Sequence, residues 1–252
     1  MKNKGVDEMK IAVLVKTDMN STKVYTIHRD KVTQHTDNLF LSDTDKNVIE
    51  FALNWIKKDG GRVDAYTFEN EILADRVLHE ALAMGANTAT KFEGVNINDP
   101  LQANLIAQGF VEYIKNKGYD LILTGSTIDS DVIGAAIAND LNFNYYDYVS
   151  SINTDFKFET KLEKGNIQGK YELPAVVSVL DSINTPHLPS FINLRDAIDT
   201  PIHVAQLNIH SNDQSTIVAD PRKPKQIIFD LHKDPDAISE LVNVLKKDGI
   251  LK

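Results

Sequence analysis

The segment of this sequence with the most distinct chemical character is residues 124–131, which read TGSTIDSD. It follows an apolar stretch that predicts a buried strand and precedes a predicted helix. Small side chains let a ligand approach the backbone, and the amide groups at a helix start attract phosphate. Serine and aspartate can equally cap the helix. Because Asp129 and Asp131 would repel a bare phosphate, a ribose contact and a plain cap are the two readings that stay open.

Acidic residues in this segment and in one other allow a catalytic interpretation. Asp129 and Asp131 could form an acid–base pair, but two residues apart in a loop they need not converge, and no nucleophile lies near them in sequence. Residues 42–45 read SDTD, and Ser42 and Asp45 have the spacing of a capping box. Negative charge at a helix start also suits the helix dipole, so a cap is a sufficient explanation there.

Composition excludes several other classes of site. The seven histidines are scattered without metal-ligand spacing, and there is no cysteine, which excludes disulfides, iron–sulfur clusters and a cysteine nucleophile. The sequence contains no GxGxxG, GxxxxGK[ST], GxSxG or HExxH pattern. We therefore predict no metal site.

Charge and hydropathy give further expectations. The 252 residues carry a net charge of −9, which argues against a nucleic-acid partner. No apolar run approaches the roughly 20 residues that span a bilayer, and the first nine residues have no apolar signal core. We expect a cytoplasmic protein without membrane insertion.

Strand and helix patterns alternate through the first 152 residues. Such alternation predicts an α/β fold with a doubly wound, mainly parallel sheet. Ligands of these folds sit at the carboxyl edge of the strands, here the loops at residues 16–21, 68–71 and 125–134. Strands are predicted at residues 10–15, 63–68, 89–92, 119–124 and 145–152, helices at 45–59, 72–82, 101–114 and 132–141, and a small hairpin at 24–33.

The pattern changes after residue 152. Residues 156–171 predict a hairpin and 175–180 a strand, whereas 184–191, with two prolines and His187, predict an irregular loop. Residues 203–229 show weak periodicity, and a last helix is predicted between Asp234-Pro235 and Gly249. We expect a domain over residues 9–205 and a C-terminal linker and helical arm over 206–252. The arm docks on a partner subunit or covers the chain's own sheet.

Five segments carry recognisable motifs in a fixed order. They are MKIAVLVK at residues 9–16, LSDTDKNVIEFAL at 41–53, EALAMGA at 80–86, YDLILTGSTIDSD at 119–131, and residues 173–202, which begin LPAVV. Together they resemble the β subunit of electron-transfer flavoproteins, and the final helix resembles that family's C-terminal segment. Their combined order and spacing make the resemblance specific.

The resemblance implies an adenine-nucleotide α-hydrolase-like fold and a heterodimer with a larger α subunit. Such a subunit carries electrons, through FAD held with the α subunit, between a flavin dehydrogenase and a downstream acceptor. It has no catalytic residues of its own, and it usually buries an AMP or, in some members, a second FAD.

Residue by residue, the resemblance implies two sets of contacts. A large apolar side chain on an exposed loop suits an interface hot spot, and Phe191 stands at the family's anchor position. The partner-docking set is His187, Leu188, Phe191 and Asn193. The cofactor-binding set is Leu14, Ser42, Asp43, Thr44, Asp45, Phe68, Ile128, Asp129, Ser130, Asp131, Val132, Ile133 and Gly134.

Three segments differ from the family pattern. Ser42-Asp43-Thr44 replaces Asn-Pro-aromatic, Glu69-Asn70 replaces Gly-Pro, and the loop at residues 129–134 is shorter. These differences leave two alternatives open. One is a non-redox adenine-nucleotide-binding or regulatory module on the same fold, and the other is a β subunit whose small nucleotide site is empty.

Overall fold

The computed structural model describes residues 8–18, 25–28, 31–34, 39–69, 71–95, 102–153, 157–207, 227–230 and 233–251. Its contacts divide the chain into two compact units, Met1–Thr216 and Ile217–Lys252. None of the helices in these ranges is long and apolar enough to cross a bilayer.

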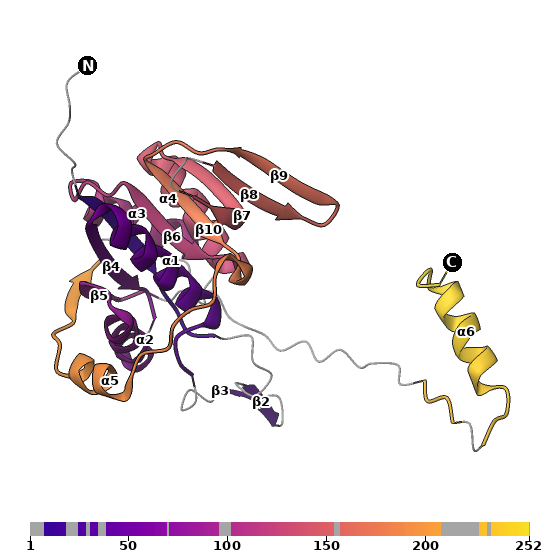
Figure 1. Ribbon diagram of the computed structural model, residues 1–252. Helices are drawn as coiled ribbons and strands as arrows, with labels where there is room; N and C mark the ends of the chain where they lie inside the picture. The colour runs from indigo at the N-terminus through magenta and orange to yellow at the C-terminus, as the bar shows by residue number, and fades with distance from the viewer. Residues whose placement is uncertain are drawn as a thin grey trace. The chain divides into compact units, whose positions relative to one another are not determined.

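The first unit is built on one large sheet (Figure 1). Among the described residues the strand order is β11-β5-β4-β1-β6-β10-β7-β8-β9. Strands β11 to β7 run parallel, and β8 and β9 extend the sheet as an antiparallel hairpin. The predicted doubly wound, mainly parallel sheet is thereby confirmed. The strands are β1 (Met9–Leu14), β4 (Gly61–Thr67), β5 (Thr88–Glu93), β6 (Leu121–Gly125), β7 (Asn144–Ile152), β8 (Lys157–Leu162), β9 (Gly165–Lys170), β10 (Ala175–Val179) and β11 (His203–Gln206).

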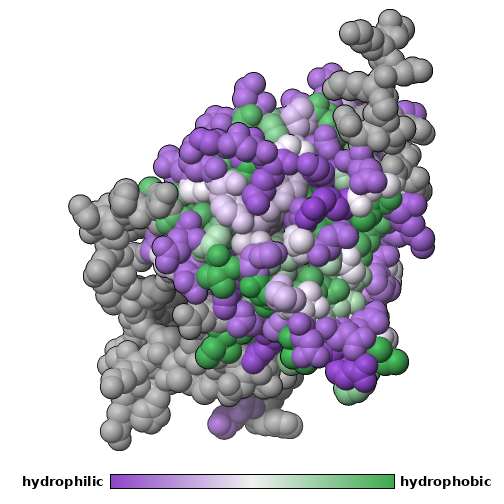
Figure 2. All heavy atoms as spheres, turned by 90° about the vertical axis from the view of Figure 1, so that its left-hand side faces the viewer, coloured by the Kyte–Doolittle hydropathy of each residue, from purple (hydrophilic) through white to green (hydrophobic). Residues whose placement is uncertain are grey.

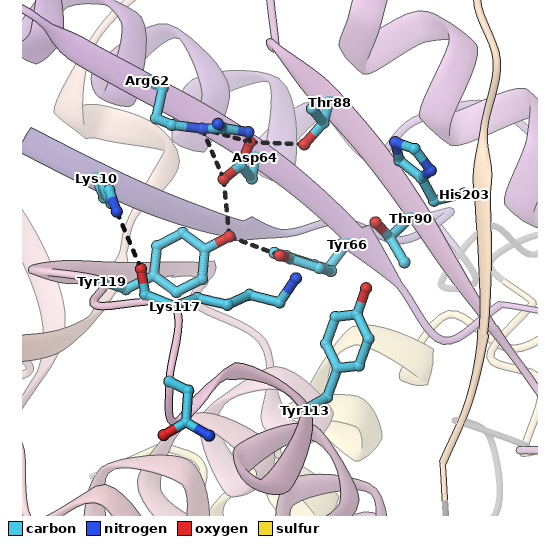
Figure 3. A pocket seen from close by; sticks show the side chains of 11 residues that line it. Lys10, Arg62, Asp64, Tyr66, Thr88, Thr90, Tyr113, Lys117, Tyr119 and His203 are labelled. Carbon is cyan, nitrogen blue, oxygen red and sulfur yellow. Dashed lines mark hydrogen bonds and ion pairs between the residues drawn. The ribbon is translucent and has the colours of Figure 1, made fainter.

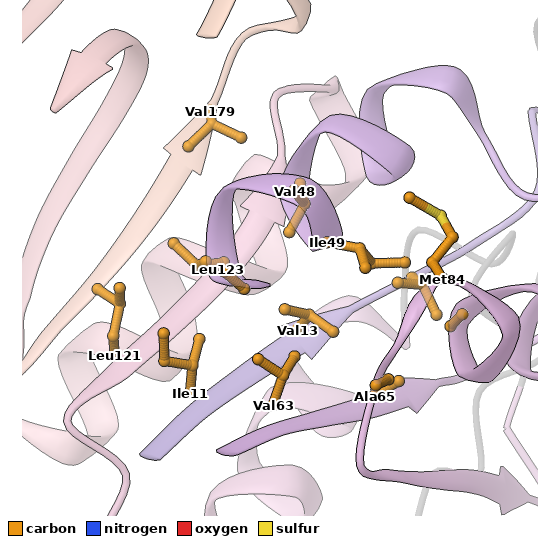
Figure 4. Packing of buried hydrophobic residues seen from close by; sticks show 14 of the residues in the cluster. Ile11, Val13, Val48, Ile49, Val63, Ala65, Met84, Leu121, Leu123 and Val179 are labelled. Carbon is orange, nitrogen blue, oxygen red and sulfur yellow. The ribbon is translucent and has the colours of Figure 1, made fainter. Parts of the chain in front are cut away.

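Helices cover both faces of the sheet because its central strands are apolar on both sides. Along β1, Ile11 and Val13 pack with α1 and α2, whereas Ala12 and Leu14 pack on the opposite face with α3 and α4. Figure 4 shows the first of these layers, in which Val48 and Ile49 of α1 lie over Val13 and Leu123. The helices are α1 (Asp43–Asp59), α2 (Glu71–Met84), α3 (Ala103–Ile114), α4 (Ile128–Leu141) and α5 (Phe191–Ile198), with a 3-10 turn at Asp181–Ile183.

The predicted N-cap is confirmed for α1, whereas α4 begins earlier than predicted. Ser42 Oγ accepts a hydrogen bond from the amide of Asp45 at 3.2 Å and caps α1. Helix α4 begins at Ile128, four residues earlier than predicted. Thr127 is its N-cap, and its hydroxyl accepts from the Ser130 amide at 3.5 Å. Part of the segment predicted as a ligand loop is therefore the first turn of a helix.

Two elements were not predicted from sequence. Helix α5 begins in the segment predicted as irregular, and strand β11 pairs with β5 at the edge of the sheet. Of the α5 residues only Ala197 is buried, and β11 is largely exposed. Strand β11 is short and has no apolar alternation. Helix α5 does have apolar residues at helical spacing, Phe191, Leu194 and Ile198, which the prediction of an irregular loop did not use.

Outside the large sheet lies a small antiparallel hairpin of β2 (Tyr25–His28) and β3 (Lys31–Gln34), as predicted. The second unit contains α6 (Ala237–Lys247). Ala237 is buried in α6, whereas Ile238 and Leu241 are exposed. Most of the region predicted as a linker, residues 208–226, lies outside the described residues, and docking of the arm stays a prediction.

Candidate functional site

The carboxyl edge of the sheet is the place where this fold positions a ligand. Strands β1 and β6 are neighbours, and the chain continues from them to opposite sides of the sheet. The loops after β1, β4 and β6 therefore meet at this switch point, together with the first turns of α1 and α4. Three acidic side chains, Asp45, Glu69 and Asp131, determine what this edge can bind.

Asp45, in the first turn of α1, reaches back across the switch point. The carboxylate accepts the amide of Lys16 at 2.9 Å and is also bonded by the amide of Gly125. A side chain on Gly125 would place its Cβ 2.6 Å from Asp45 Oδ1, so only glycine fits there. Burial raises the pKa of Asp45 to about 7, against the amide bonds that favour its charged form.

Glu69 joins the loops that follow β4 and β1. Glu69 Oε1 accepts the amide of Thr17 at 2.9 Å and its hydroxyl at 2.6 Å. Both residues are buried, with 2% of Glu69 exposed. Glu69 Oε2 has no hydrogen-bond partner among the described residues. This oxygen is an acceptor, suited to a donor such as a hydroxyl or an amino group.

Asp131 lies in the first part of α4 and is also held from the sheet. The hydroxyl of Ser178, on β10, donates to Asp131 Oδ1, and Ser126 Oγ donates to Oδ2 at 3.4 Å. Burial raises the pKa of Asp131, and the two hydroxyls partly oppose that shift. The phenol of Tyr145 donates to the Asp131 carbonyl at 3.2 Å, which fixes the turn.

These bonds engage four of the backbone amides at this edge. The amides of Lys16 and Gly125 bind Asp45, the amide of Thr17 binds Glu69, and the amide of Ser126 binds the Val179 carbonyl. A phosphate site presents free amides at a helix or loop start. Carboxylates thus engage three of these amides, and their negative charge opposes a phosphate beside them.

The space left at the edge is small. A cavity of about 10 Å³ lies between Leu14, Lys16, Phe68, Ser130 and Ile133. One water molecule needs about 10–15 Å³. Among the described residues this cavity is therefore near the size of one water molecule. A larger cavity lies at the opposite edge of the sheet.

A second candidate surface is formed by the loop at residues 184–190 and helix α5. The side-chain amide of Asn47 donates to the carbonyl of Asn184 at 2.8 Å, and the His187 ring bonds Glu50. Ser190 then caps α5 by accepting the amide of Asn193 at 3.1 Å. The segment is thus tied to α1 and packs on α2, while its apolar side chains stay outside. Phe191 is 82% exposed and Leu188 73%.

Comparison with known proteins identifies the family that uses this fold. A family model for the electron transfer flavoprotein domain matches residues 31–207. The chain belongs to the electron transfer flavoprotein family. It is also 28% identical over 190 residues to the electron transfer flavoprotein subunit beta of Bacillus subtilis (strain 168), and the alignment covers 72% of each protein. The resemblance to β subunits drawn from the sequence is confirmed.

In this electron transfer flavoprotein chain, only some predicted cofactor residues meet. Leu14, Phe68, Ser130 and Ile133 line the small cavity. Ser42, Thr44 and Asp45 lie in or before the first turn of α1, with Thr44 against Gly125.

The other predicted cofactor residues have different surroundings. Asp43 is exposed and pairs with Lys46 at 3.0 Å. Val132 is exposed, and Gly134 packs under Tyr145. The side chains of Ile128 and Asp129 lie outside the described residues.

The cofactor-binding set predicted from the sequence omits three residues that shape this edge: Thr17, Glu69 and Ser178. Glu69 carried a usable signal, since it is a charged residue directly after an apolar strand. Its partner Thr17 is 52 positions away, and Ser178 is 47 positions from Asp131. Such pairings cannot be read from local spacing.

Proposed function

We propose that this chain is the β subunit of a heterodimeric electron-transfer flavoprotein. Paired with an α subunit that holds FAD, it supports electron transfer between a flavin dehydrogenase and a downstream acceptor. Membership of the family supports the redox role. The observation that carries the role of this particular chain is the exposed apolar segment at residues 188–198, held in place by polar contacts to its own α1 and α2.

That segment has the composition of a protein-docking surface. Besides Leu188 and Phe191, Ile192 is 59% exposed and Ile198 65%. The side of the molecule on which α5 lies in Figure 1 faces the viewer in Figure 2, where hydrophobic patches lie among polar groups. Exposed large apolar side chains in a cluster are typical of interaction sites. Anchoring by Asn47 and Glu50 lowers the entropy lost when a partner binds.

The arrangement at the carboxyl edge supports a β subunit without a phosphate-bearing nucleotide of its own. The donors there bind Asp45 and Glu69, and the remaining cavity is near the size of one water. We infer that the chain holds neither AMP nor a second FAD, because Asp45 and Glu69 already engage nearby amides. When bound in the heterodimer, FAD would supply the electron-carrying isoalloxazine ring, and its phosphates would rest on the α subunit.

Co-purification tests the heterodimer and its cofactor. The full chain is co-expressed with the α subunit encoded by the same genome, and the complex is examined by absorbance and by mass spectrometry of released ligands. We expect a yellow complex with one FAD per heterodimer and no AMP. A colourless complex would contradict the redox role, and stoichiometric AMP would contradict the inferred absence of AMP. Binding of ATP alone would favour a regulatory nucleotide-binding module.

Truncation of the exposed apolar segment tests docking. Phe191→Ala should weaken coupling to the partner dehydrogenase by about 2 kcal/mol, roughly thirtyfold, because apolar anchors dominate interface energies. The measurement is the rate of dehydrogenase-linked flavin reduction at subsaturating protein. Ile167→Ala, which removes a 52% exposed side chain from β9, is the matched control. Equal effects of the two substitutions, or loss of FAD in Phe191→Ala alone, would contradict the assignment.

A further inference from the structure

A cavity of about 530 Å³ lies at the amino edge of the sheet, at the opposite ends of the strands from the switch point (Figure 3). The starts of β1, β4, β5 and β11 line it, together with the end of α3 and the turn that leads to β6. Pockets for small organic ligands have volumes of about 300–1,000 Å³. The distance from Lys10 to Lys16 along β1 places this cavity about 20 Å from the carboxyl edge.

One wall of the cavity is a fixed polar network. The Tyr119 phenol donates to Asp64 Oδ2 at 2.8 Å, so the Tyr66 phenol donates to Tyr119 across 2.5 Å. The guanidinium of Arg62 binds both oxygens of Asp64, and the Thr88 hydroxyl adds a bond at 2.6 Å. Burial raises the pKa of both phenols, so they remain neutral. The network gives the cavity a preformed wall and leaves Asp64 no further acceptor position.

Two lysines supply the remaining charge of the cavity lining. The ammonium of Lys10 donates to the carbonyl of Lys117 at 3.2 Å. The ammonium of Lys117 lies 4.3 Å from the centre of the Tyr113 ring. In Figure 3 the Lys117 side chain passes below Tyr119 and points toward Tyr66 and Tyr113. Because Arg62 and Asp64 neutralise each other, two lysine charges are left over in a chain whose net charge is −9.

Donors to a ligand complete the site. The Thr90 side chain is buried at the cavity wall, and Tyr113 presents a phenol beside Lys117. Hydroxyls and ammonium groups around a concave surface recognise a carboxylate or phosphate through charge-assisted hydrogen bonds. A cationic ligand would meet only like charges there.

We propose that this cavity binds a small organic anion bearing carboxylate or phosphate groups, with Lys117 and Lys10 as its charged contacts and Tyr113 and Thr90 as hydrogen-bond donors. The site is separate from the electron-transfer role, since none of these residues lies at the carboxyl edge or in α5. Its size fits one ligand of about the dimensions of citrate.

Calorimetry on the full chain tests the proposal, with citrate as a carboxylate probe and inorganic pyrophosphate as a phosphate probe. We expect binding of one molecule per chain for at least one probe. Lys117→Met should weaken that binding about tenfold, the loss expected for one charge-assisted contact. Lys115→Met is the matched control because Lys115 lies two residues away, is exposed and does not line the cavity.

The outcomes separate the alternatives. Binding of citrate alone assigns a carboxylate ligand, and binding of pyrophosphate alone assigns a phosphate ligand. Failure of both probes at millimolar concentration overturns the proposal. Equal weakening by Lys115→Met and Lys117→Met also overturns it, because it would indicate attraction to surface charge only. Thr90→Val removes one hydrogen-bond donor and should weaken binding severalfold. An unchanged thermal unfolding midpoint of the ligand-free variant would show that it is folded.

Discussion

The two edges of the same sheet differ in charge and in filling. At the carboxyl edge Asp45 and Glu69 draw in the nearby backbone amides, and a cavity of about 10 Å³ is left. At the amino edge Lys10 and Lys117 help to line a cavity of about 530 Å³, and the one acidic side chain in that lining, Asp64, is already paired with Arg62. At the edge that binds ligands in most folds of this type, Asp45 and Glu69 already engage three backbone amides.

The difference teaches how local charge decides what a fold's ligand edge can do. Parallel strands and helix starts supply amide donors at the carboxyl edge whatever the sequence. Acidic residues placed there, such as Asp45 and Glu69, bind some of those donors without a change of fold. The pKa values of the acidic residues also differ between the two edges. Burial raises the pKa of Asp45 at the carboxyl edge. At the amino edge, hydrogen bonds outweigh burial and lower the pKa of Asp64.

Asp45→Asn should produce the largest change. The raised pKa of Asp45 means that the folded state holds a proton that the unfolded chain releases, so stability falls as the pH rises from about 4 to 7. The difference between that pKa and the ordinary pKa of an aspartate corresponds to roughly 4 kcal/mol of stability. The variant lacks this titration, so its stability relative to the native chain should rise by about that amount between pH 4 and pH 8. Urea unfolding of both proteins at pH 4 and pH 8 measures this difference in stability. An equal change of stability with pH in the two proteins would contradict the raised pKa of Asp45.

Asp64→Asn, at the amino edge, should change the pH dependence of folding stability in the opposite direction to Asp45→Asn. The lowered pKa of Asp64 stabilises the fold above the unfolded pKa, and this contribution is lost as the pH falls through the folded value. Replacement leaves Arg62 and Tyr119 competing for one acceptor and should cost about 2 kcal/mol at pH 7. The difference from the native chain should shrink toward pH 3. A constant difference from pH 3 to pH 7 would show that the carboxylate charge is not involved.

Glu69→Gln should have the smallest effect. The amide keeps an oxygen for Thr17, and Glu69 Oε2 has no partner to lose among the described residues. We expect a loss under about 1 kcal/mol at neutral pH. Glu69→Ala, which leaves the Thr17 amide and hydroxyl without their acceptor, should cost about 2–3 kcal/mol more. Equal unfolding midpoints for the two variants would show that this contact does not stabilise the edge.

Local signals in the sequence were sufficient for the central fold. The unbroken apolar run of β1 and the amphipathic spacing of α1, with Ser42 as its cap, predicted these elements because each depends on neighbours along the chain. Predictions failed at α5 and β11, which bury few side chains. They also failed at the start of α4, because the polar residues of its first turn resemble a loop sequence.

The sequence by itself determined the α/β class, the family and the identity of the loops that meet at the carboxyl edge, since periodicity and ordered motifs are local properties. Only the tertiary structure decided which backbone amides the acidic residues at this edge bind. Asp45 reaches Lys16 and Glu69 reaches Thr17 across 29 and 52 positions, and such contacts arise only when separate strands are brought side by side. The cavity at the amino edge has the same origin, because Lys10, Asp64, Lys117 and His203 come together only through strand order.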